Sequence, residues 1–450
     1  MSYKLLNIFL IIIFPTLLFG APPKDALSSS SSYYYGKLGN YSAFAIPSNT
    51  MDSLNFYLFY KLPLNNYLYV LGSKGEYVAN YTIELTLSDE DGIVRFHKII
   101  SDTASASSPL TNNYNYTFKI DYLNIKIPNK DYNLNIRAVD NNSRNQEKTS
   151  LKFIYSKQSK KNILSYLFLS NKDNSETFTP IILNNALNFS GDKIRILFSI
   201  DNKFSTDLNK IQIKRIKNEN EDFWTDDVDI KGNLGKIQTG NISVEQTTSN
   251  NCSIKFDNFQ DTKVTAGYDE TNYDNLYYFD IQNNNFIPGN YLMNIINSKK
   301  DTIAIEFKVI WDDEPLSLKN IQFAKKISEI FFNKDEMDKI NTSDKIESFQ
   351  NLVKEWDKFN PNPKSKYNEV MVEFYRRVDI AYFKFSTFSE KNGALTDQGK
   401  VFILYGNPDK IKQVFRSGKL VEVWTYEKLI KEFTFESIQE GVFKLTELKE

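Results

Sequence analysis

The sequence predicts a mainly β protein that ends in an α+β domain, and three observations support this fold class. Phe and Tyr are frequent, at 34 and 27 of 450 residues, and aromatic side chains favour the half-buried surface of a sheet. Before residue 311, short apolar segments alternate with polar turns at strand-like spacing. After residue 315, apolar side chains recur every three or four positions, as they do on helices.

The N-terminus has the three parts of a signal peptide. Lys4 precedes the apolar run 5–19, and the small residues Gly20 and Ala21 follow it. A membrane-spanning helix needs about 20 apolar residues, whereas this run is shorter and contains Pro15. We therefore expect residues 1–20 to be removed, leaving no stable membrane span. The mature protein is expected in the periplasm or at the cell surface of a bacterium, and not as a lipoprotein, because no Cys lies near the cleavage point.

Residues 33–158 are predicted to form a first β domain. Its strand-like segments cover 55–62, 80–87, 93–100, 116–127, 132–139 and 150–155. The turn-rich sequence Ser-Asp-Glu-Asp-Gly at 88–92 should join two of these segments as a hairpin. Strands at this spacing, with no helical pattern between them, predict an antiparallel sandwich.

A short internal similarity predicts a second sandwich over residues 160–311. Ile127-Pro128 precedes Tyr132 in the first domain, and Ile287-Pro288-Gly289 precedes Tyr291 in the second. In each case the Tyr opens a strand that should turn back into the last strand of its domain. A Tyr at this position is typical of immunoglobulin-like sandwiches, in which its hydroxyl bonds to the backbone. We therefore expect two tandem immunoglobulin-like sandwiches, joined at 156–161.

The C-terminal domain is predicted to span residues 315–450. Helices are expected at 318–332, at about 346–356 and at 365–385, where apolar side chains follow helical spacing. The sequence Asn-Pro-Asn-Pro at 360–363 should end the second helix. Short strands at 400–405, 420–426, 431–435 and 442–448 predict a small antiparallel meander after the helices.

A set of motifs stands out in this C-terminal region. They are Glu373-Phe374-Tyr375-Arg376-Arg377-Val378, Gly393-Ala394-Leu395-Thr396-Asp397, the run from Gly399 to Asp409, and Trp424-Thr425-Tyr426. Together they resemble the GWxTD domain found in exported bacterial proteins. Ala394 departs from the pattern because it stands where the family has its eponymous Trp, and Gln398 stands where a basic residue is usual. The resemblance implies an envelope protein with no established reaction.

The motif residues are the candidate functional residues, and we expect most of them to act as a structural clamp. They are Glu369, Glu373, Tyr375, Arg376, Arg377, Thr396, Asp397, Gly399, Tyr405, Gly406, Pro408, Asp409, Trp424 and Tyr426. Glu369, Glu373 and Arg377 are four residues apart and share one helix face. If that face packs under the Thr396-Asp397 loop, the Arg377 guanidinium can bind Asp397 bidentately. Gly393, Gly399 and Gly406 are expected in turns, and Pro408 at the start of a turn or helix.

Composition excludes several kinds of site. The chain has one His, His97, and one Cys, Cys252, so these ligands cannot build a zinc site and no internal disulfide can form. No nucleophile motif lies near His97. Lys+Arg (55) and Asp+Glu (56) nearly cancel, which argues against nucleic-acid binding. We expect no cofactor and no metal.

The sequence names no ligand, and we expect a non-enzymatic binding or assembly module of the cell envelope. Its partner would be another envelope protein or a glycan. The alternative is a carboxylate-dependent hydrolase that acts on an envelope glycan or peptide. Its leading carboxylates would be Glu369, Glu373 and Asp397.

Overall fold

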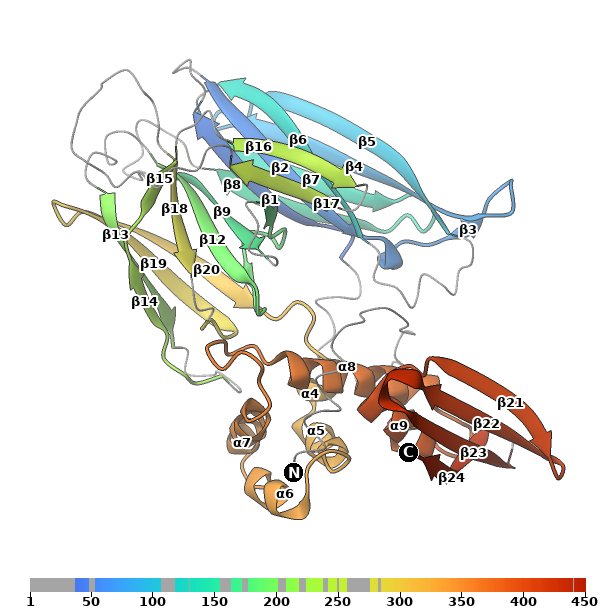
Figure 1. Cartoon of the computed structure of the whole chain (residues 1–450). Helices are drawn as coiled ribbons and strands as arrows, with labels where there is room; N and C mark the ends of the chain where they lie inside the picture. The colour runs from blue at the N-terminus through green and yellow to red at the C-terminus, as the bar shows by residue number, and fades with distance from the viewer. Residues whose placement is uncertain are drawn as a thin grey trace.

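The computed structural model describes residues 37–47, 53–106, 118–128, 130–153, 163–171, 177–200, 208–217, 224–237, 242–248, 251–256, 276–281, 285–439 and 441–450. The predicted signal peptide (1–20) lies outside these residues, as does the predicted linker at 156–161. The described chain folds into two sandwiches followed by helices and a four-stranded sheet (Figure 1). The predicted fold class is therefore confirmed.

The first sandwich packs a three-stranded sheet against a five-stranded one. The first sheet has the order β1-β2-β6 and contains β1 (Asn40–Pro47), β2 (Ser53–Pro63) and β6 (Phe118–Pro128). The second contains β3 (Val70–Leu71), β4 (Tyr77–Asp89), β5 (Val94–Ala106), β7 (Tyr132–Asp140) and β8 (Gln146–Phe153). Buried and half-buried residues alternate along β4, as expected where one face meets the core. The predicted hairpin at 88–92 is confirmed as the connection between β4 and β5.

The second sandwich packs a seven-stranded sheet against a five-stranded one. The larger sheet has the order β15 (Gly235–Ile237), β18 (Leu276–Ile281), β12 (Lys193–Ile200), β9 (Ile163–Asn171), β10 (Thr177–Pro180), β17 (Asn251–Phe256), β16 (Ile242–Thr248). The smaller has the order β11 (Leu187–Asn188), β20 (Thr302–Ile310), β19 (Gly289–Asn297), β13 (Leu208–Ile216), β14 (Asp229–Gly232). β11 pairs with β20 in parallel, and this short pairing brings residues 181–188 beside the end of β20.

Both predicted corner tyrosines form the expected bond. The Tyr132 hydroxyl donates to the Pro128 carbonyl at 2.7 Å, and the Tyr291 hydroxyl donates to the Ile287 carbonyl at 2.8 Å. Each Tyr stands near the start of the first strand of a hairpin, β7–β8 in one sandwich and β19–β20 in the other. The short sequence similarity thus marks equivalent corners of the two sandwiches.

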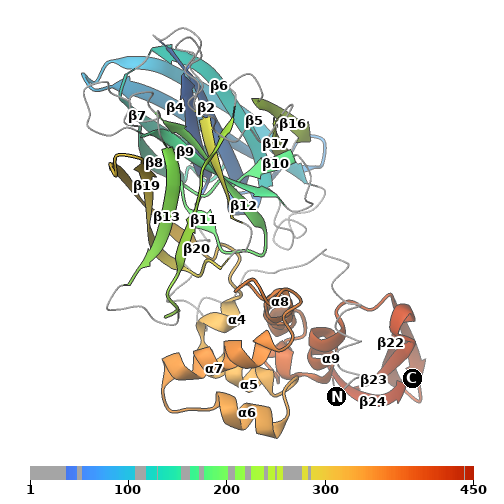
Figure 2. The same cartoon turned by 60° about the vertical axis from the view of Figure 1, so that its left-hand side comes forward.

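The two sandwiches share a core, and β1 lies between them. Alternate residues of β1 face opposite ways: Ala43 and Ala45 pack in the core of the first sandwich, whereas Phe44 and Ile46 pack against residues of the second. The Ala45 N–H donates to Ser165 Oγ of β9 at 2.9 Å. The β16–β17 hairpin also lies beside β6 (Figures 1 and 2). These contacts fix the sandwiches against each other.

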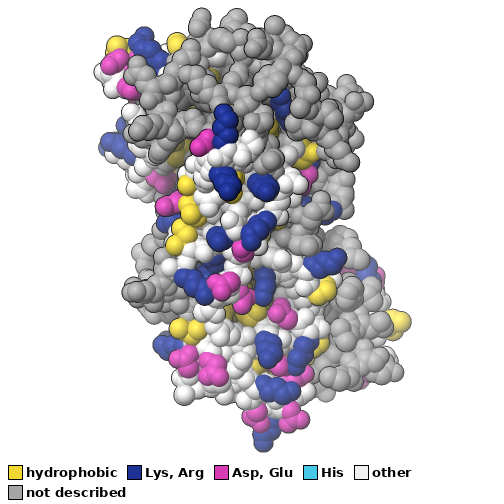
Figure 3. All heavy atoms as spheres, turned by 90° about the vertical axis from the view of Figure 1, so that its left-hand side faces the viewer, with side chains coloured by type: hydrophobic (Ala, Val, Ile, Leu, Met, Phe, Trp, Pro, Cys, Tyr) yellow, Lys and Arg dark blue, Asp and Glu magenta, His cyan; other side chains and the backbone are white. Residues whose placement is uncertain are grey.

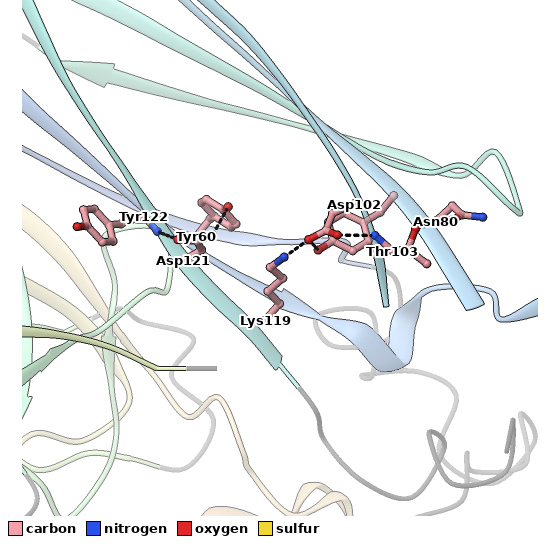
Figure 4. A network of polar contacts seen from close by, with 8 residues as sticks. Tyr60, Asn80, Asp102, Thr103, Lys119, Asp121 and Tyr122 are labelled. Carbon is pink, nitrogen blue, oxygen red and sulfur yellow. Dashed lines mark hydrogen bonds and ion pairs between the residues drawn. The ribbon is translucent and has the colours of Figure 1, made fainter. Parts of the chain in front are cut away.

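A polar network closes one edge of the first sandwich (Figure 4). Lys119 of β6 bonds Asp102 of β5, and thereby links the two sheets. The Tyr81 hydroxyl donates to Asp102 Oδ2 at 3.1 Å, and the Tyr60 hydroxyl donates to Asp121 Oδ2 at 3.0 Å. Burial would raise the pKa of Asp102, but the bonds from Lys119, the Thr103 N–H and Tyr81 together outweigh it and hold the pKa below its usual value.

The C-terminal domain contains helices and a four-stranded antiparallel sheet. The helices are α4 (Leu316–Lys319), α5 (Ile321–Ser328), α6 (Lys334–Ile340), α7 (Lys345–Asp357), α8 (Glu369–Lys384) and α9 (Asp397–Tyr405). The strands, in spatial order, are β21 (Lys410–Arg416), β22 (Lys419–Tyr426), β23 (Lys431–Gln439) and β24 (Val442–Lys449). Figures 1 and 2 place α4–α7 beneath the second sandwich and the sheet to one side, beyond α8 and α9.

Several predicted elements of this domain are wrong in type or extent. The expected strand 400–405 belongs to α9, because Thr396 caps the helix by accepting the Gly399 N–H at 3.0 Å. The expected helix 318–332 is divided into α4 and α5 at Asn320, whose side chain caps α5. α6 and β21 were not predicted. A capping box of Asn333 and Glu336 starts α6 and is visible in the sequence.

An aromatic cluster joins the C-terminal domain to the second sandwich. Phe189 makes edge contacts with Trp224, Trp311 and Tyr367, at ring-centroid distances of 5.3, 5.1 and 5.2 Å. Trp224 in turn contacts Phe349 of α7 at 5.5 Å. Because these rings belong to one continuous hydrophobic core, the helices are held in a fixed position under the sandwich.

Candidate functional site

A cavity of about 870 Å³ lies where the two sandwiches meet the C-terminal domain. This volume is in the usual range for small-molecule sites, about 300–1,000 Å³. The first sandwich contributes Lys37, Asn40, Lys61, Pro63, Asn66 and Phe118; the second contributes Tyr166, residues 183–186, Asn188 and much of the end of β20; the C-terminal region contributes residues 312–316, Lys319, Arg376, Asp379 and Phe383. The walls therefore come from segments more than 300 residues apart in the chain.

The linker after β20 supplies three consecutive acids to the cavity wall, and each faces a base from a different element. The nitrogen–oxygen distances are 3.8, 2.7 and 3.8 Å for Asp312 with Lys61 of β2, Asp313 with Arg376 of α8, and Glu314 with Lys319 of α4. The linker thus makes ionic contacts with the first sandwich and with two helices. These pairs neutralise the charges that line this part of the cavity.

Carboxylates in and next to these pairs have raised pKa values. Burial raises the pKa of Glu314 to about 6 and the pKa of Asp379 to about 6, and it also raises the pKa of Asp313. Asp379 accepts the backbone N–H groups of Leu316 and Ser317, at 2.6 and 2.9 Å, and so caps the start of α4. Two carboxyl groups in one cavity wall therefore titrate closer to neutral pH than usual.

The cavity wall also carries polar groups that are not committed to other contacts in the described part of the chain. The buried indole N–H of Trp311 has no acceptor there, and no hydrogen bond is formed by the Tyr166 hydroxyl or the Asn185 side chain. Asn184 and Asn185 have left-handed backbones, with φ of 51° and 62°. Consecutive left-handed residues are strained and occur preferentially at functional sites, although Asn tolerates this conformation better than most residues.

The predicted motif residues lie mostly outside this cavity, where they join α8, α9 and the sheet. Thr396 accepts the Gly399 N–H and donates to the Gly393 carbonyl at 2.8 Å. Asp397 Oδ2 accepts the Leu445 N–H of β24 at 2.9 Å. These bonds fix the start of α9 against the preceding turn and against the sheet edge.

The predicted bond between Arg377 and Asp397 is wrong. The Arg377 Nε donates to Glu373 Oε1 at 2.7 Å, one turn back on α8. Its guanidinium lies under Gly406, where an added Cβ would come within 3.3 Å of Arg377 Cζ. Glu373 offers Arg377 a nearby partner at the favourable i,i+4 spacing, while the backbone of β24 occupies Asp397.

The motif glycines have two different roles. Gly406 has φ of 78° and ends α9, so its predicted place in a turn is confirmed. Gly399 instead lies inside α9, and an added Cβ would be 1.9 Å from the Gly393 carbonyl oxygen. Gly393, which opens the short 3₁₀ turn η4 (Gly393–Leu395), is equally crowded by the Ala381 carbonyl of α8, at 2.3 Å from an added Cβ. Pro408 lies in the bend before β21.

The motif residues that follow α9 hold its end against the sheet. The Tyr426 hydroxyl donates to the Gly406 carbonyl at 2.8 Å, and the rings of Tyr405 and Tyr426 are 5.7 Å apart. Asp409 Oδ2 accepts the Glu427 N–H at 2.7 Å. The Trp424 ring packs against Phe385 at 5.6 Å.

The motif residues on α8 point in different directions. The buried Tyr375 hydroxyl is 2.6 Å from Ser328 Oγ of α5. Glu369 is exposed at the start of the helix. Arg376 reaches the junction cavity. The hydrolase candidates Glu369, Glu373 and Asp397 therefore lie in separate environments and do not form one site.

Residues 289–445 match the family model described as the GWxTD domain. The C-terminal part of the chain is therefore a GWxTD domain. The matched region begins at β19, so it includes the last hairpin of the second sandwich as well as the C-terminal domain. No curated protein matches this chain.

The two departures from the GWxTD pattern occupy defined places. Ala394, at the eponymous Trp position, is fully buried in η4 beside α8. Gln398, at the usual basic position, donates to Glu422 Oε2 at 2.7 Å. Glu422 also accepts from the Trp424 indole and from Gln413. A carboxylate at position 422 is the partner that a basic residue at position 398 would need.

The described surface of this chain shows no single-sign field on the face formed by the second sandwich and α7. Basic and acidic side chains are interspersed there, with only scattered apolar ones (Figure 3). Within the described residues, no helix is long and apolar enough to cross a membrane. No cluster of three His, Cys, Asp or Glu side chains suited to a metal ion occurs among them.

Sequence reasoning missed most of the cavity. The linker sequence Trp-Asp-Asp-Glu-Pro at 311–315 marked a change of domain, but nothing local showed that its acids would meet Lys61 and Arg376. The sequence signal that could have been used is the run of three acids between a Trp and a Pro. Such a run in a short linker needs basic partners if it becomes buried.

Proposed function

We propose that this chain is a non-enzymatic binding module of the bacterial cell envelope, with the junction cavity as its ligand site. The observation that carries the proposal is a cavity built by all three parts of the chain, whose wall holds polar groups without partners in the described residues. The Tyr166 hydroxyl and the Asn185 side chain line the cavity and form no hydrogen bond within the described residues, which favours a ligand that supplies their partners.

The character of the wall favours an uncharged, polyhydroxylated ligand such as a segment of envelope glycan. The acids of the linker are matched by Lys61, Arg376 and Lys319, so they leave little net charge for an ionic ligand. The groups without a hydrogen bond in the described residues include two neutral ones, the Tyr166 hydroxyl and the Asn185 carboxamide, beside the oppositely charged Glu306 and Lys308. Aromatic side chains, among them Phe118, Tyr166 and Phe307, supply apolar surface beside them.

Titration calorimetry of the full chain with maltotriose, cellotriose and triacetylchitotriose tests this proposal. We expect saturable binding of at least one neutral oligosaccharide. The Asn185→Ala and Tyr166→Phe variants should each weaken binding by about 2–10-fold, as expected for one lost hydrogen bond. Asn294→Ala, on β19 outside the cavity, serves as the matched control. Binding that both cavity variants leave unchanged would exclude the cavity as the site.

A second candidate function is the carboxylate-dependent hydrolase, which one observation favours. Glu314 and Asp379 share the cavity wall, and the pKa of each is raised to about 6, the range of a general acid near neutral pH. Both carboxyls already have internal partners, Lys319 and the start of α4, which favours the binding function. Hydrolysis of a bound oligosaccharide by the wild type, lost in Glu314→Gln with binding retained, would favour the enzyme.

A further inference from the structure

The strand β21 forms the outer edge of the C-terminal sheet. It pairs with β22 through seven residues, from Lys410 with Thr425 to Arg416 with Lys419. Among the described residues, no strand pairs with its other side. Figure 1 shows it as the uppermost strand of this sheet. An unpaired edge presents a row of backbone N–H and C=O groups to solvent.

The exposed apolar and basic side chains of β21 lie on opposite faces of the sheet, with the half-buried Val414 on the basic face and Gln413 on the apolar one. Ile411 and Phe415 lie on one face, and their side chains are 54% and 79% exposed. Lys410, Lys412 and Arg416 alternate with them and so lie on the other face. Basic residues on an edge strand protect against unwanted pairing, but an exposed Phe and Ile do not. The apolar pair therefore favours a surface that a partner covers.

The hairpin turn sets which backbone groups of β21 are available. Ser417 and Gly418 form a two-residue turn with φ of 49° and 78°, and the residues that flank such a turn form a hydrogen-bonded pair. Arg416 therefore bonds to Lys419, and the neighbouring residues alternate. It follows that the backbone N–H and C=O groups of Gln413 and Phe415 point away from β22.

The charge of the strand defines the complementary partner. Lys410 and Lys419 have acidic neighbours, Glu427 and Glu436. Lys412 and Arg416 have no acidic partner within the described residues. An incoming strand with alternating acidic and apolar residues would place its acids beside these cations and its apolar side chains beside Ile411 and Phe415. Backbone bonds would supply affinity, and the two faces would supply specificity.

We propose that β21 binds an extended acidic segment of a partner protein, which adds a fifth strand to the C-terminal sheet. This surface is separate from the junction cavity, so the chain would hold a ligand at the cavity and a protein partner at the sheet edge. Because no residue of β21 lines the cavity, an experiment that disproves peptide binding at β21 leaves ligand binding at the cavity untouched, and the reverse also holds.

Fluorescence anisotropy with the full chain tests this proposal. The probe is a labelled ten-residue peptide of alternating Val and Glu, compared with the same peptide carrying Lys in place of Glu. We expect the acidic peptide to bind at least ten-fold more tightly, with an affinity that falls as salt rises. The double variant Lys412→Glu/Arg416→Glu should lose at least ten-fold in affinity, whereas Lys354→Glu, an exposed base on α7, should change nothing.

A backbone variant separates strand addition from simple charge attraction. Gln413→Pro removes an outward N–H and leaves both cations in place, and Gln413→Ala controls for loss of the bond to Glu422. We expect the Pro variant, but not the Ala variant, to weaken the acidic peptide at least ten-fold. Thermal melts check whether both variants fold. If the Pro variant does not fold, Phe415→Ser replaces it and should weaken binding of the acidic peptide.

Three results would overturn the proposal. The first is equal affinity for the acidic and basic peptides, and the second is full binding by the charge-reversed variant. The third is occupation of the edge by something else, seen as concentration-dependent dimerisation in sedimentation or as binding to vesicles of anionic lipid, with either effect lost in Phe415→Ser.

Discussion

The Arg376 Nη2 atom lies 2.7 Å from Asp313 Oδ2, and this pair joins the longest helix of the GWxTD domain to the linker that leaves the second sandwich. The linker's neighbouring acid, Asp312, faces Lys61 of the first sandwich. The relative position of the three parts of the chain, and with it the shape of the cavity, thus depends in part on a few ion pairs.

Replacing Arg376 by Met should destabilise the protein by about 1 kcal/mol or less, because the side chains of Arg376 and Asp313 are 37% and 43% exposed and solvent screens their attraction. The measurement is urea unfolding at pH 7. Arg137→Met is the matched control, because Arg137 and Glu84 form an exposed pair that should contribute at most about 0.5 kcal/mol. Equal losses for the two variants would show that the Arg376 pair is an ordinary surface contact.

The raised pKa of Asp379 predicts a pH dependence of stability with a definite sign. Because the pKa is about 6 in the folded protein and about 4 in an unfolded chain, the folded state binds more protons between these values. The stability contributed by Asp379 is therefore full below pH 4 and is lost as the pH rises through 6. Asp379→Asn cannot ionise, so the advantage of the wild type over the variant should shrink from pH 4.5 to pH 7.

Urea unfolding of both proteins at several pH values measures this difference. Asp338→Asn, at an exposed position on α6, controls for the general loss of an acid. A wild-type advantage that grows towards pH 7 would mean that the carboxylate, and not the neutral carboxyl, is the preferred form at this site.

Gly399→Ala should destabilise the GWxTD domain, although Ala is normally better than Gly in a helix by about 1 kcal/mol. The reversal is expected because the new methyl group would lie 1.9 Å from the Gly393 carbonyl oxygen, and backbone must move to admit it. We expect a loss of about 1–3 kcal/mol. Lys400→Ala, the next and exposed helix position, should be near neutral. A Gly399→Ala protein as stable as the wild type would contradict the tight packing of η4 against α9.

The hydroxyl groups of the two corner tyrosines should contribute different amounts to the stability of the fold. The Tyr291 hydroxyl donates to the Ile287 carbonyl and accepts the Ile287 N–H at 3.1 Å, in a fully buried position. Tyr291→Phe leaves both backbone groups unsatisfied and should cost about 1–3 kcal/mol. Tyr132→Phe removes a single, partly exposed bond and should cost about 1 kcal/mol or less. Thermal melts of the two variants give the comparison; a larger effect at Tyr132 would contradict it.

Features that depend on local chemistry could be predicted from the sequence. The turn at 88–92 and the corner tyrosines are determined by neighbouring residues, and all of them are in place. The run at 400–405 was misassigned because five apolar residues fit a strand or a helix equally. Here the helix is favoured because Thr396 caps its start and Gly399 packs closely against Gly393. The strand β21 was not predicted because its basic residues and Gln413 interrupt the alternation of polar and apolar residues that is typical of a strand.

The cavity could not be predicted, for a different reason. The contact between Lys61 and Asp312 joins residues about 250 positions apart, and no periodicity or motif specifies such a pair. The family motif drew attention to residues such as Asp397 and Trp424, which stabilise the domain that carries it. Of the predicted candidates, only Arg376 is identified in the cavity wall.

Filling the junction cavity tests the account most directly. Asn185→Gly and Asn185→Trp change the same wall position, which already has a left-handed backbone; the first enlarges the cavity and the second occupies it. We predict that a neutral oligosaccharide bound by the wild type in calorimetry still binds Asn185→Gly. Asn185→Trp should lose about 1–2 kcal/mol of stability to left-handed strain, remain folded in a thermal melt, and abolish binding. Undiminished binding by a folded Asn185→Trp protein would contradict the central claim that the ligand occupies this cavity.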